Sequence, residues 1–180
     1  MELKRVVVTG LGAVTPLGLN VDETWEALLN GVSGAGPITH FDASQFKTQF
    51  ACEVKNFDPT LYLDKKEVRK FDRYAQFAVA AAKEAVGDSA LDLEKVDKNR
   101  VGVIFAAGIG GIRTFEEEVG GYFTNIERGP KFNPFFIPKM IADIAAGHIS
   151  MIYGFHGPNY ATVSACASST HSLIDAFNNI

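Results

Sequence analysis

Residues 160–170 read YATVSACASST, and this stretch decides which fold the sequence predicts. Tyr160–Ser164 has the composition of a buried strand, and Ala167 opens a stretch that reads as a helix. A strand that passes directly into a helix is the repeating unit of an α/β protein. Cys166 stands at the junction between the two expected elements.

The position of Cys166 is one that suits a nucleophile. The N–H groups and the positive end of a following helix stabilise a thiolate, and the backbone N–H of Cys166 can help to hold an oxyanion. Ala165 and Ala167 are small enough to let a substrate carbonyl approach. The arrangement is similar to a nucleophile elbow without its G-x-S-x-G sequence. From these residues alone, a small buried hydrophobic residue is an equally good interpretation. Cys52 has no comparable setting and is expected to be structural.

The histidines offer no evident base for this thiol. His171 follows Cys166 by five residues, which turns it about 140° away around a helix. His40, His148 and His156 are expected to be ordinary core or surface residues. No pair has metal-ligand spacing, so no metal is predicted. Histidine partners of the cysteine, if it needs them, are expected beyond residue 180.

Further strands and helices alternate along the chain, which favours an α/β fold. The apolar stretches Val6–Val8 and Val101–Ala106 read as buried parallel strands. Helices are expected over Val21–Leu29, through Tyr74–Ala82 up to Gly87, and over Met140–Tyr153.

The connecting segments carry weaker signals. Asp64 and Glu67 have the D-x-x-E spacing of a capping box. Glu116–Glu118 is expected to be a solvated helix face, and Ser33–Pro59 looks irregular. The sequence stops at Ile180 inside an expected helix, without a glycine stop. The 180 residues are therefore expected to be the front part of a longer protein.

The bulk composition excludes several classes of protein. Hydrophobic residues make up 47% and charged residues 21% of the chain, as in globular proteins. A net charge of −4 argues against binding to nucleic acid. Two cysteines make no disulfide framework, which favours a reducing cytoplasm. Neither a targeting segment in residues 1–10 nor a membrane-spanning stretch is predicted.

A rival motif follows the first expected strand, where Gly10 and Gly12 open like a dinucleotide-binding fingerprint. The third glycine is missing, because position 15 is Thr15, followed by Pro16. Two glycines are a weak signal. A nucleotide-dependent oxidoreductase therefore stays open only as a secondary interpretation.

An ordered set of motifs resembles one family closely. These motifs are Val6–Gly12 with Thr15–Gly18, Gly108–Gly111, Pro134–Pro138, Ala146–His148, Gly157–Pro158 and Ser164–Cys166. In this order they resemble the β-ketoacyl-[acyl-carrier-protein] synthases of type II, the condensing enzymes of bacterial fatty acid elongation. Each motif is weak by itself, but the set covers essentially the whole chain and is specific.

The resemblance implies a thiolase-like α/β fold, stacked as α-β-α-β-α layers, of which residues 1–180 are most of the first half. It implies a decarboxylating Claisen condensation in which Cys166 accepts an acyl chain and malonyl-carrier protein supplies the carbanion. It also implies no cofactor, and a homodimer that pairs through the Tyr160–Ser164 strand. Two histidines and a second oxyanion donor come from the second half in this family, so these 180 residues alone are expected to be inactive.

The resemblance also assigns further site residues. Ile109 matches the mouth of the acyl pocket, and Phe136 and Ile137 match its wall near the dimer interface. Ordinary core packing is an equally good interpretation of all three.

Acyl carrier protein is the implied partner, and it is small and acidic. Lys66, Arg69 and Lys70 share a helix face by spacing, and together with Lys131 they are expected to dock it. A solvated face is the plainer interpretation of this cluster. A third functional class is a non-catalytic partner subunit on the same fold, in which the nucleophile is typically replaced, and the presence of Cys166 counts against it.

Overall fold

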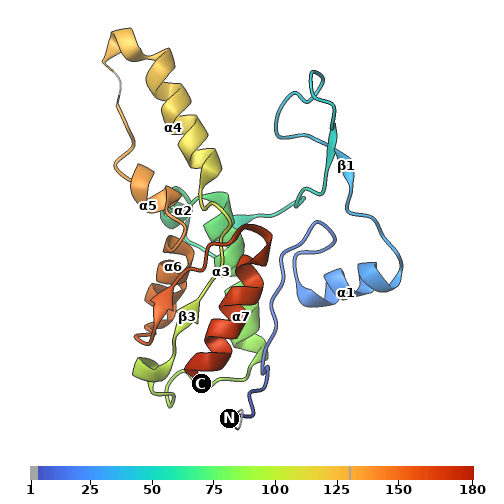
Figure 1. The fold of residues 1–180 in the computed structure, drawn as a ribbon, viewed down its shortest axis with the longest axis vertical. Coiled ribbons are helices and arrows are strands. Elements are labelled where there is room, and N and C mark those ends of the chain that lie inside the picture. The colour runs from blue at the N-terminus through green and yellow to red at the C-terminus, as the bar shows by residue number, and fades with distance from the viewer. Residues whose placement is uncertain (1–3, 130) are drawn as a thin grey trace.

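A computed structural model describes residues 4–129 and 131–180 (Figure 1). Residues 1–3, the start of the stretch in which no targeting segment is predicted, therefore lie outside the described part. The helices and strands, in chain order, are α1 Val21–Leu29, β1 Gly36–Pro37, β2 Phe50–Ala51, α2 Lys65–Val68, α3 Arg73–Asp88, β3 Val103–Ile104, α4 Ile112–Thr124, α5 Phe136–Met140, α6 Ile144–Tyr153, β4 Asn159–Tyr160 and α7 Ser168–Asn179.

The core lies where α3 packs against α6. Ala75 and Ala78 of α3 and Ala145 of α6 are 2% exposed or less, and small side chains of this kind let the two helix backbones approach closely. Phe71 closes one end of this core, and its ring stacks on the imidazole of His148 with 3.6 Å between the ring centroids. Burial lowers the pKa of His148, so this ring is neutral in the folded protein at pH 7.

The central sheet is shorter than the sequence predicts. β3 and β4 pair in parallel through Val103 with Asn159 and Ile104 with Tyr160. The predictions of strands over the whole of Val101–Ala106 and Tyr160–Ser164 are wrong at their ends. The backbone N–H of Phe105 donates to the Tyr160 carbonyl, and the chain then enters the Gly108–Gly111 loop. Among the described residues, the pairing of the two strands therefore does not continue beyond Tyr160.

The expected strand Val6–Val8 is also wrong. The segment is extended but unpaired within the part of the chain that the structure describes, and Val7 and Val8 are 62% and 76% exposed. A stretch that is apolar on both faces is buried only within a sheet that is covered on both faces. None of the described strands lies beside it.

The glycines of the rival motif serve helix packing. A Cβ on Gly10 would lie 2.2 Å from the Ala85 carbonyl oxygen, and one on Gly12 would lie 1.9 Å from that of Ala81. The backbone N–H of Leu11 donates to Asp88, and that of Ala13 to Glu84. Because α3 already occupies these N–H groups, they are not directed at a pyrophosphate.

The helix predictions succeed where the ends carry clear signals. α1 runs over Val21–Leu29 as predicted, with the Asn20 side chain accepting from the N–H of Glu23. α6 ends at Gly154, whose φ of 70° is left-handed and favours glycine. The helix over Met140–Tyr153 is split, however, since α5 ends at Met140 and Ile141 is extended.

The capping box predicted for Asp64 and Glu67 is wrong. Asp64 precedes α2 but its side chain makes no capping hydrogen bond. The carboxylate of Glu67 instead lies 2.7 Å from the ammonium of Lys70. The Glu67 side chain thus forms an ion pair with Lys70, three residues further on, and not the hydrogen bond of a capping box.

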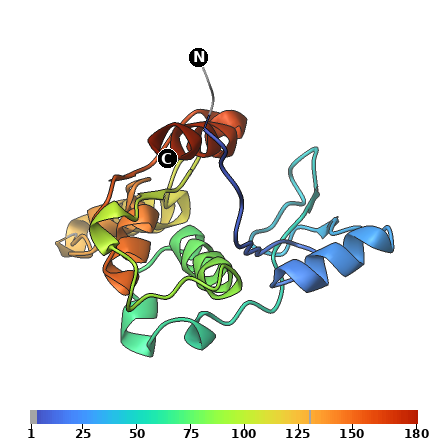
Figure 2. The ribbon, with the colours of Figure 1, turned by 90° about the horizontal axis from the view of Figure 1, so that it is seen from below.

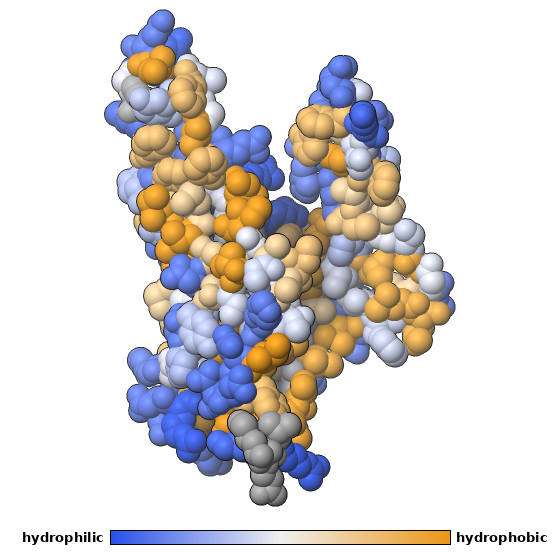
Figure 3. All heavy atoms as spheres, viewed as in Figure 1, coloured by the Kyte–Doolittle hydropathy of each residue, from blue (hydrophilic) through white to orange (hydrophobic). Residues whose placement is uncertain are grey.

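Two projecting arms give the molecule an open shape. α4 projects on one side and the β1–β2 segment on the other, with a hollow between them (Figures 1 and 3). Figure 2 shows α1 and the β1–β2 segment set apart from α3, α6 and α7. A cleft of about 690 Å³ lies in this hollow, and its walls include Phe41, Tyr74 and Arg113. None of the helices in the described residues is long and apolar enough to span a membrane.

Candidate active site

Cys166 lies on a tight turn that joins the sheet to α7. A single 3₁₀ turn, Ala165–Ala167, follows the extended segment, and α7 begins at Ser168. Ala165 has a φ of 49°, which is left-handed and strained for a residue with a Cβ. Cys166 is exposed at the outer side of this turn. A sharp turn, an exposed thiol and a helix N-terminus directly behind it are the features that a nucleophile elbow requires.

The hydroxyl of Ser168 braces this turn. It donates to the Ala165 carbonyl at 2.7 Å and accepts from the Ser164 N–H at 2.8 Å. Ser168 is 3% exposed, so both hydrogen bonds are shielded from water. The two bonds span Cys166 and hold Ala165 in its strained conformation.

A second layer of polar contacts supports Ser168 and Ser164. The Thr162 hydroxyl donates to the Ser168 carbonyl at 2.8 Å and lies 2.8 Å from the Ser172 hydroxyl. Nδ1 of His171 lies 2.6 Å from the hydroxyl of Ser164. The sequence predicts that His171 is a poor base for Cys166, and it does not predict this contact with Ser164. The only available signal was the alternation of Ser and Thr on both sides of the cysteine.

Cys52 is exposed and not buried, and its expected structural role stays a prediction. It directly follows β2, in a two-stranded ribbon too narrow to enclose a side chain. Selective chemistry at Cys166 must therefore come from its turn and from the end of α7, because both thiols are accessible.

The loop that holds Ile109 contacts the end of α5, the helix that carries Phe136 and Ile137, through the Gly111 N–H, which donates to the Met140 carbonyl. Ile109 lies in the loop before α4 and is 68% exposed, while Phe136 and Ile137 form the first turn of α5. Phe136 is half-buried and lies 6.2 Å from Phe115 of α4 between ring centroids, whereas Ile137 is 54% exposed. Ile109 and Ile137 are thus exposed, and Phe136 packs partly against α4.

The basic residues divide into two groups. Lys66 and Arg69 are exposed on and just after α2, whereas Lys70 pairs with Glu67 and places its ammonium 5.8 Å from the centroid of Phe135. Lys131 is exposed in the segment between α4 and α5, where it borders a small polar cleft with Arg128. Lys66 and Arg69 are thus the two members of the cluster best placed to meet another molecule.

Residues 4–129 and 131–180 contain no group of three or more His, Cys, Asp or Glu side chains that could hold an ion. His148 is predicted from the sequence to be an ordinary core or surface residue. It is partly buried, and no hydrogen-bond partner of its Nε2 lies among the described residues. Its stack on Phe71 makes it part of the core.

Comparison with known proteins decides the family. Residues 3–180 match the family model described as the N-terminal domain of β-ketoacyl synthase. The chain belongs to the β-ketoacyl synthase family. The resemblance drawn from the ordered set of motifs along the chain is thereby confirmed.

Curated members of the family are similar over almost the whole chain. The 3-oxoacyl-[acyl-carrier-protein] synthase 2 of Coxiella burnetii is 47% identical over 96% of this chain. The enzyme of the same name from Synechocystis is 43% identical over 98% of it. The chain spans 41% and 42% of the lengths of these two relatives.

Solved ketosynthases confirm the thiolase-like α/β fold. The ishigamide ketosynthase/chain length factor matches with a TM-score of 0.85 and 25% identity, over 98% of this chain and 45% of that one. A type II PKS ketosynthase, solved with its acyl-carrier protein and bound to a hexaketide, matches with a TM-score of 0.79 and 26% identity, over 98% and 46%.

Proposed function

We propose that residues 1–180 are the N-terminal half of a 3-oxoacyl-[acyl-carrier-protein] synthase of type II, a homodimeric cytoplasmic enzyme of fatty acid elongation. The observation that carries the proposal is the exposed Cys166 on a strained, braced turn before α7, in a chain of the β-ketoacyl synthase family. The names of the relatives support the substrate class.

The first step transfers an acyl chain. The thiolate of Cys166 attacks the carbonyl carbon of an acyl-carrier thioester, a tetrahedral oxyanion forms, and the C–S bond to the carrier breaks. The carrier thiolate leaves and takes a proton, and the acyl chain stays on Sγ as a new thioester. The Cys166 N–H and the N-terminal end of α7 are placed to stabilise the oxyanion and the thiolate.

The second step forms the carbon–carbon bond. Malonyl-carrier protein loses its carboxylate as carbon dioxide, and the electron pair of the broken C–C bond becomes a carbanion. The carbanion attacks the acyl thioester on Cys166, whose sulfur leaves as the thiolate. The histidines expected to assist this step belong to the second half of the enzyme, so the 180 residues alone are predicted to be inactive.

The test of this function is a reconstituted reaction. The full-length protein, mixed with acyl- and malonyl-carrier protein and no nucleotide, should release one carbon dioxide for each 3-oxoacyl-carrier product. A thermal shift with NAD(P) and no condensation would instead favour the oxidoreductase. A protein that neither condenses nor binds nucleotide, yet assembles with a ketosynthase, would be the non-catalytic partner.

Ile109→Phe is predicted to block long acyl primers while leaving short ones usable. The side chain lies in the loop before α4 and is proposed to border the acyl pocket, where a larger ring costs about 1–3 kcal/mol if the space is filled. We expect about a tenfold loss or more of kcat/KM for long primers. Assays over a series of chain lengths decide this, with Ile152→Phe on α6 as an exposed control. Equal losses at every length would make Ile109 a purely structural residue.

A further inference from the structure

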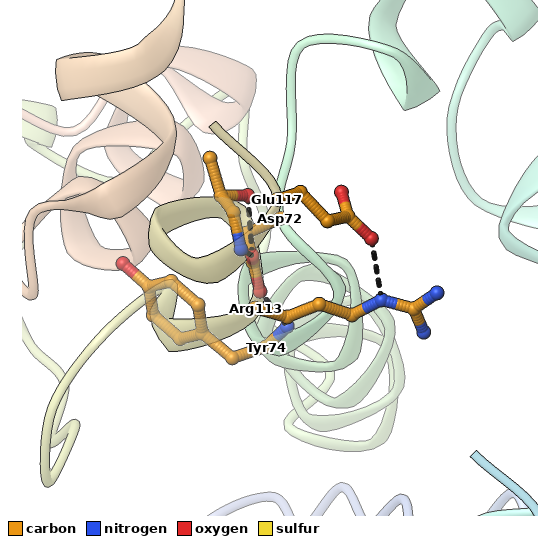
Figure 4. A network of polar contacts seen from close by, with 5 residues as sticks. Asp72, Tyr74, Arg113 and Glu117 are labelled. Carbon is orange, nitrogen blue, oxygen red and sulfur yellow. Dashed lines mark hydrogen bonds and ion pairs between the residues drawn. The ribbon is translucent and has the colours of Figure 1, made fainter. Parts of the chain in front are cut away.

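The first turn of α3 is tied to α4 by the polar contacts of Asp72 (Figure 4). It is also tied to the end of α5 by a hydrogen bond of Tyr74. Asp72 is the N-cap of α3, and its Oδ1 accepts from the Tyr74 N–H at 3.1 Å. Its Oδ2 accepts from both the N–H and the hydroxyl of Thr114, at 3.2 and 2.6 Å. One carboxylate thus caps the N-termini of α3 and α4 together.

Burial makes these contacts obligatory. Asp72 is 7% exposed and Thr114 is 3% exposed. A carboxylate removed from water is stable only where donors and positive charge surround it, and two helix N-termini supply both. The residue at the N-cap of α4 is Gly111, which has no side chain to cap the helix. Asp72 provides the cap from a distant part of the sequence.

The Gly108–Gly111 loop before α4 packs closely between the Asp72 carboxylate and the end of α5. A Cβ on Gly111 would lie 3.0 Å from Oδ2 of Asp72 and 2.5 Å from the Lys139 carbonyl oxygen. The Gly111 N–H donates to the Met140 carbonyl at 2.9 Å, and Gly110 has a φ of 87°. The position of Ile109 in the same loop is therefore set by these close contacts.

Tyr74 connects α3 to the residue that follows α5. Its hydroxyl donates to the Ile141 carbonyl at 2.5 Å, while the Ile141 N–H donates to the Ile137 carbonyl at 3.1 Å. Burial, with nearby Asp72 and Asp143, raises the pKa of Tyr74, so the hydroxyl keeps its proton as a donor. The chain of bonds runs from α3 to the turn that carries Phe136 and Ile137.

We propose that Asp72 and Tyr74 are positioning residues that set acyl chain-length selectivity. They fix the Ile109 loop and the α5 turn relative to one another, so that the two sides of the acyl pocket keep a constant separation. Neither residue is assigned a contact with substrate. The inference rests on the proposed function, because it concerns the pocket of that same site.

The experiment uses full-length Tyr74→Phe and Asp72→Asn. Loss of a hydrogen bond of this kind changes a rate constant by about three- to tenfold. We expect the ratio of kcat/KM for long primers to that for short primers to change by this factor. The rate of Cys166 alkylation should stay within about twofold of wild type, because the turn before α7 is separate. A lower folded fraction cancels in the ratio.

Tyr153→Phe is the matched control, since it removes a hydroxyl from another partly buried tyrosine of the same core. The Tyr74→Phe effect should also vanish in an Ile137→Ala background if it acts through that wall. An unchanged ratio in both Asp72→Asn and Tyr74→Phe would overturn the proposal, even if both melt at lower temperature. Failure of the proposed function is distinct, because the wild-type protein would then make no 3-oxoacyl product.

Discussion

Full-length protein with Cys166 replaced by alanine is expected to form no acyl-enzyme and to lose condensation by at least roughly 10³-fold. Alanine keeps the turn but removes the sulfur that carries the acyl chain. Ala165 and Ala167 already flank the site, so a third alanine fits without strain. Thermal melting close to that of wild type would separate this loss from unfolding.

The rates at which the two cysteines react with an alkylating reagent test the same assignment. Limited iodoacetamide should modify Cys166 much faster than Cys52, although both thiols are exposed, because only Cys166 precedes a helix N-terminus. Peptide mapping after partial reaction measures the two rates in one sample. Faster labelling of Cys52, or an alanine variant that still condenses, would refute the assignment of the nucleophile.

Lys66→Glu combined with Arg69→Glu is expected to raise KM for carrier-linked substrates by about tenfold or more. Reversing two exposed charges turns attraction for an acidic carrier into repulsion, which acts mainly on association rate. Each exposed pair by itself contributes less than about 1 kcal/mol, so single variants should be mild. Alkylation of Cys166 by a small reagent should not change.

Two further measurements test whether α2 docks the carrier protein: the salt dependence of the reaction rate and a charge reversal far from α2. The wild-type reaction should slow as the Debye length falls below about 10 Å. Lys95→Glu with Arg100→Glu reverses the same number of exposed charges beyond the far end of α3, about 24 Å of helix from α2. It should leave KM unchanged. If the α2 variant also leaves KM unaltered, the cluster is a solvated face.

The helices were predictable because their signals are local. α1 is capped by the Asn20 side chain, and α6 is followed by left-handed Gly154, so each of these ends is defined by a residue next to the helix. α3 follows its alanine-rich stretch to Asp88, one residue beyond the predicted stop. Such features can be recognised without knowledge of the rest of the molecule.

The strands and the polar contacts were not predictable in the same way. Val6–Val8 has the composition of a central strand, but pairing depends on neighbours that composition cannot supply. Asp72 looks like an ordinary N-cap, and its second role arises because α4 begins at a glycine 39 residues further along the chain. Likewise, the brace of Ser168 is apparent only once Ala165 is seen to be left-handed.

Cys166 is proposed to carry the acyl chain during turnover. Full-length protein should be mixed with an acyl-carrier thioester, without malonyl-carrier protein, then quenched in acid and mapped by mass spectrometry. We expect the mass of one acyl group on the peptide that contains Cys166. When malonyl-carrier protein is added, this acyl group should disappear as 3-oxoacyl product forms. An acyl group on Cys52 or on any other residue, or a Cys166 peptide that stays unmodified while product forms, would contradict it.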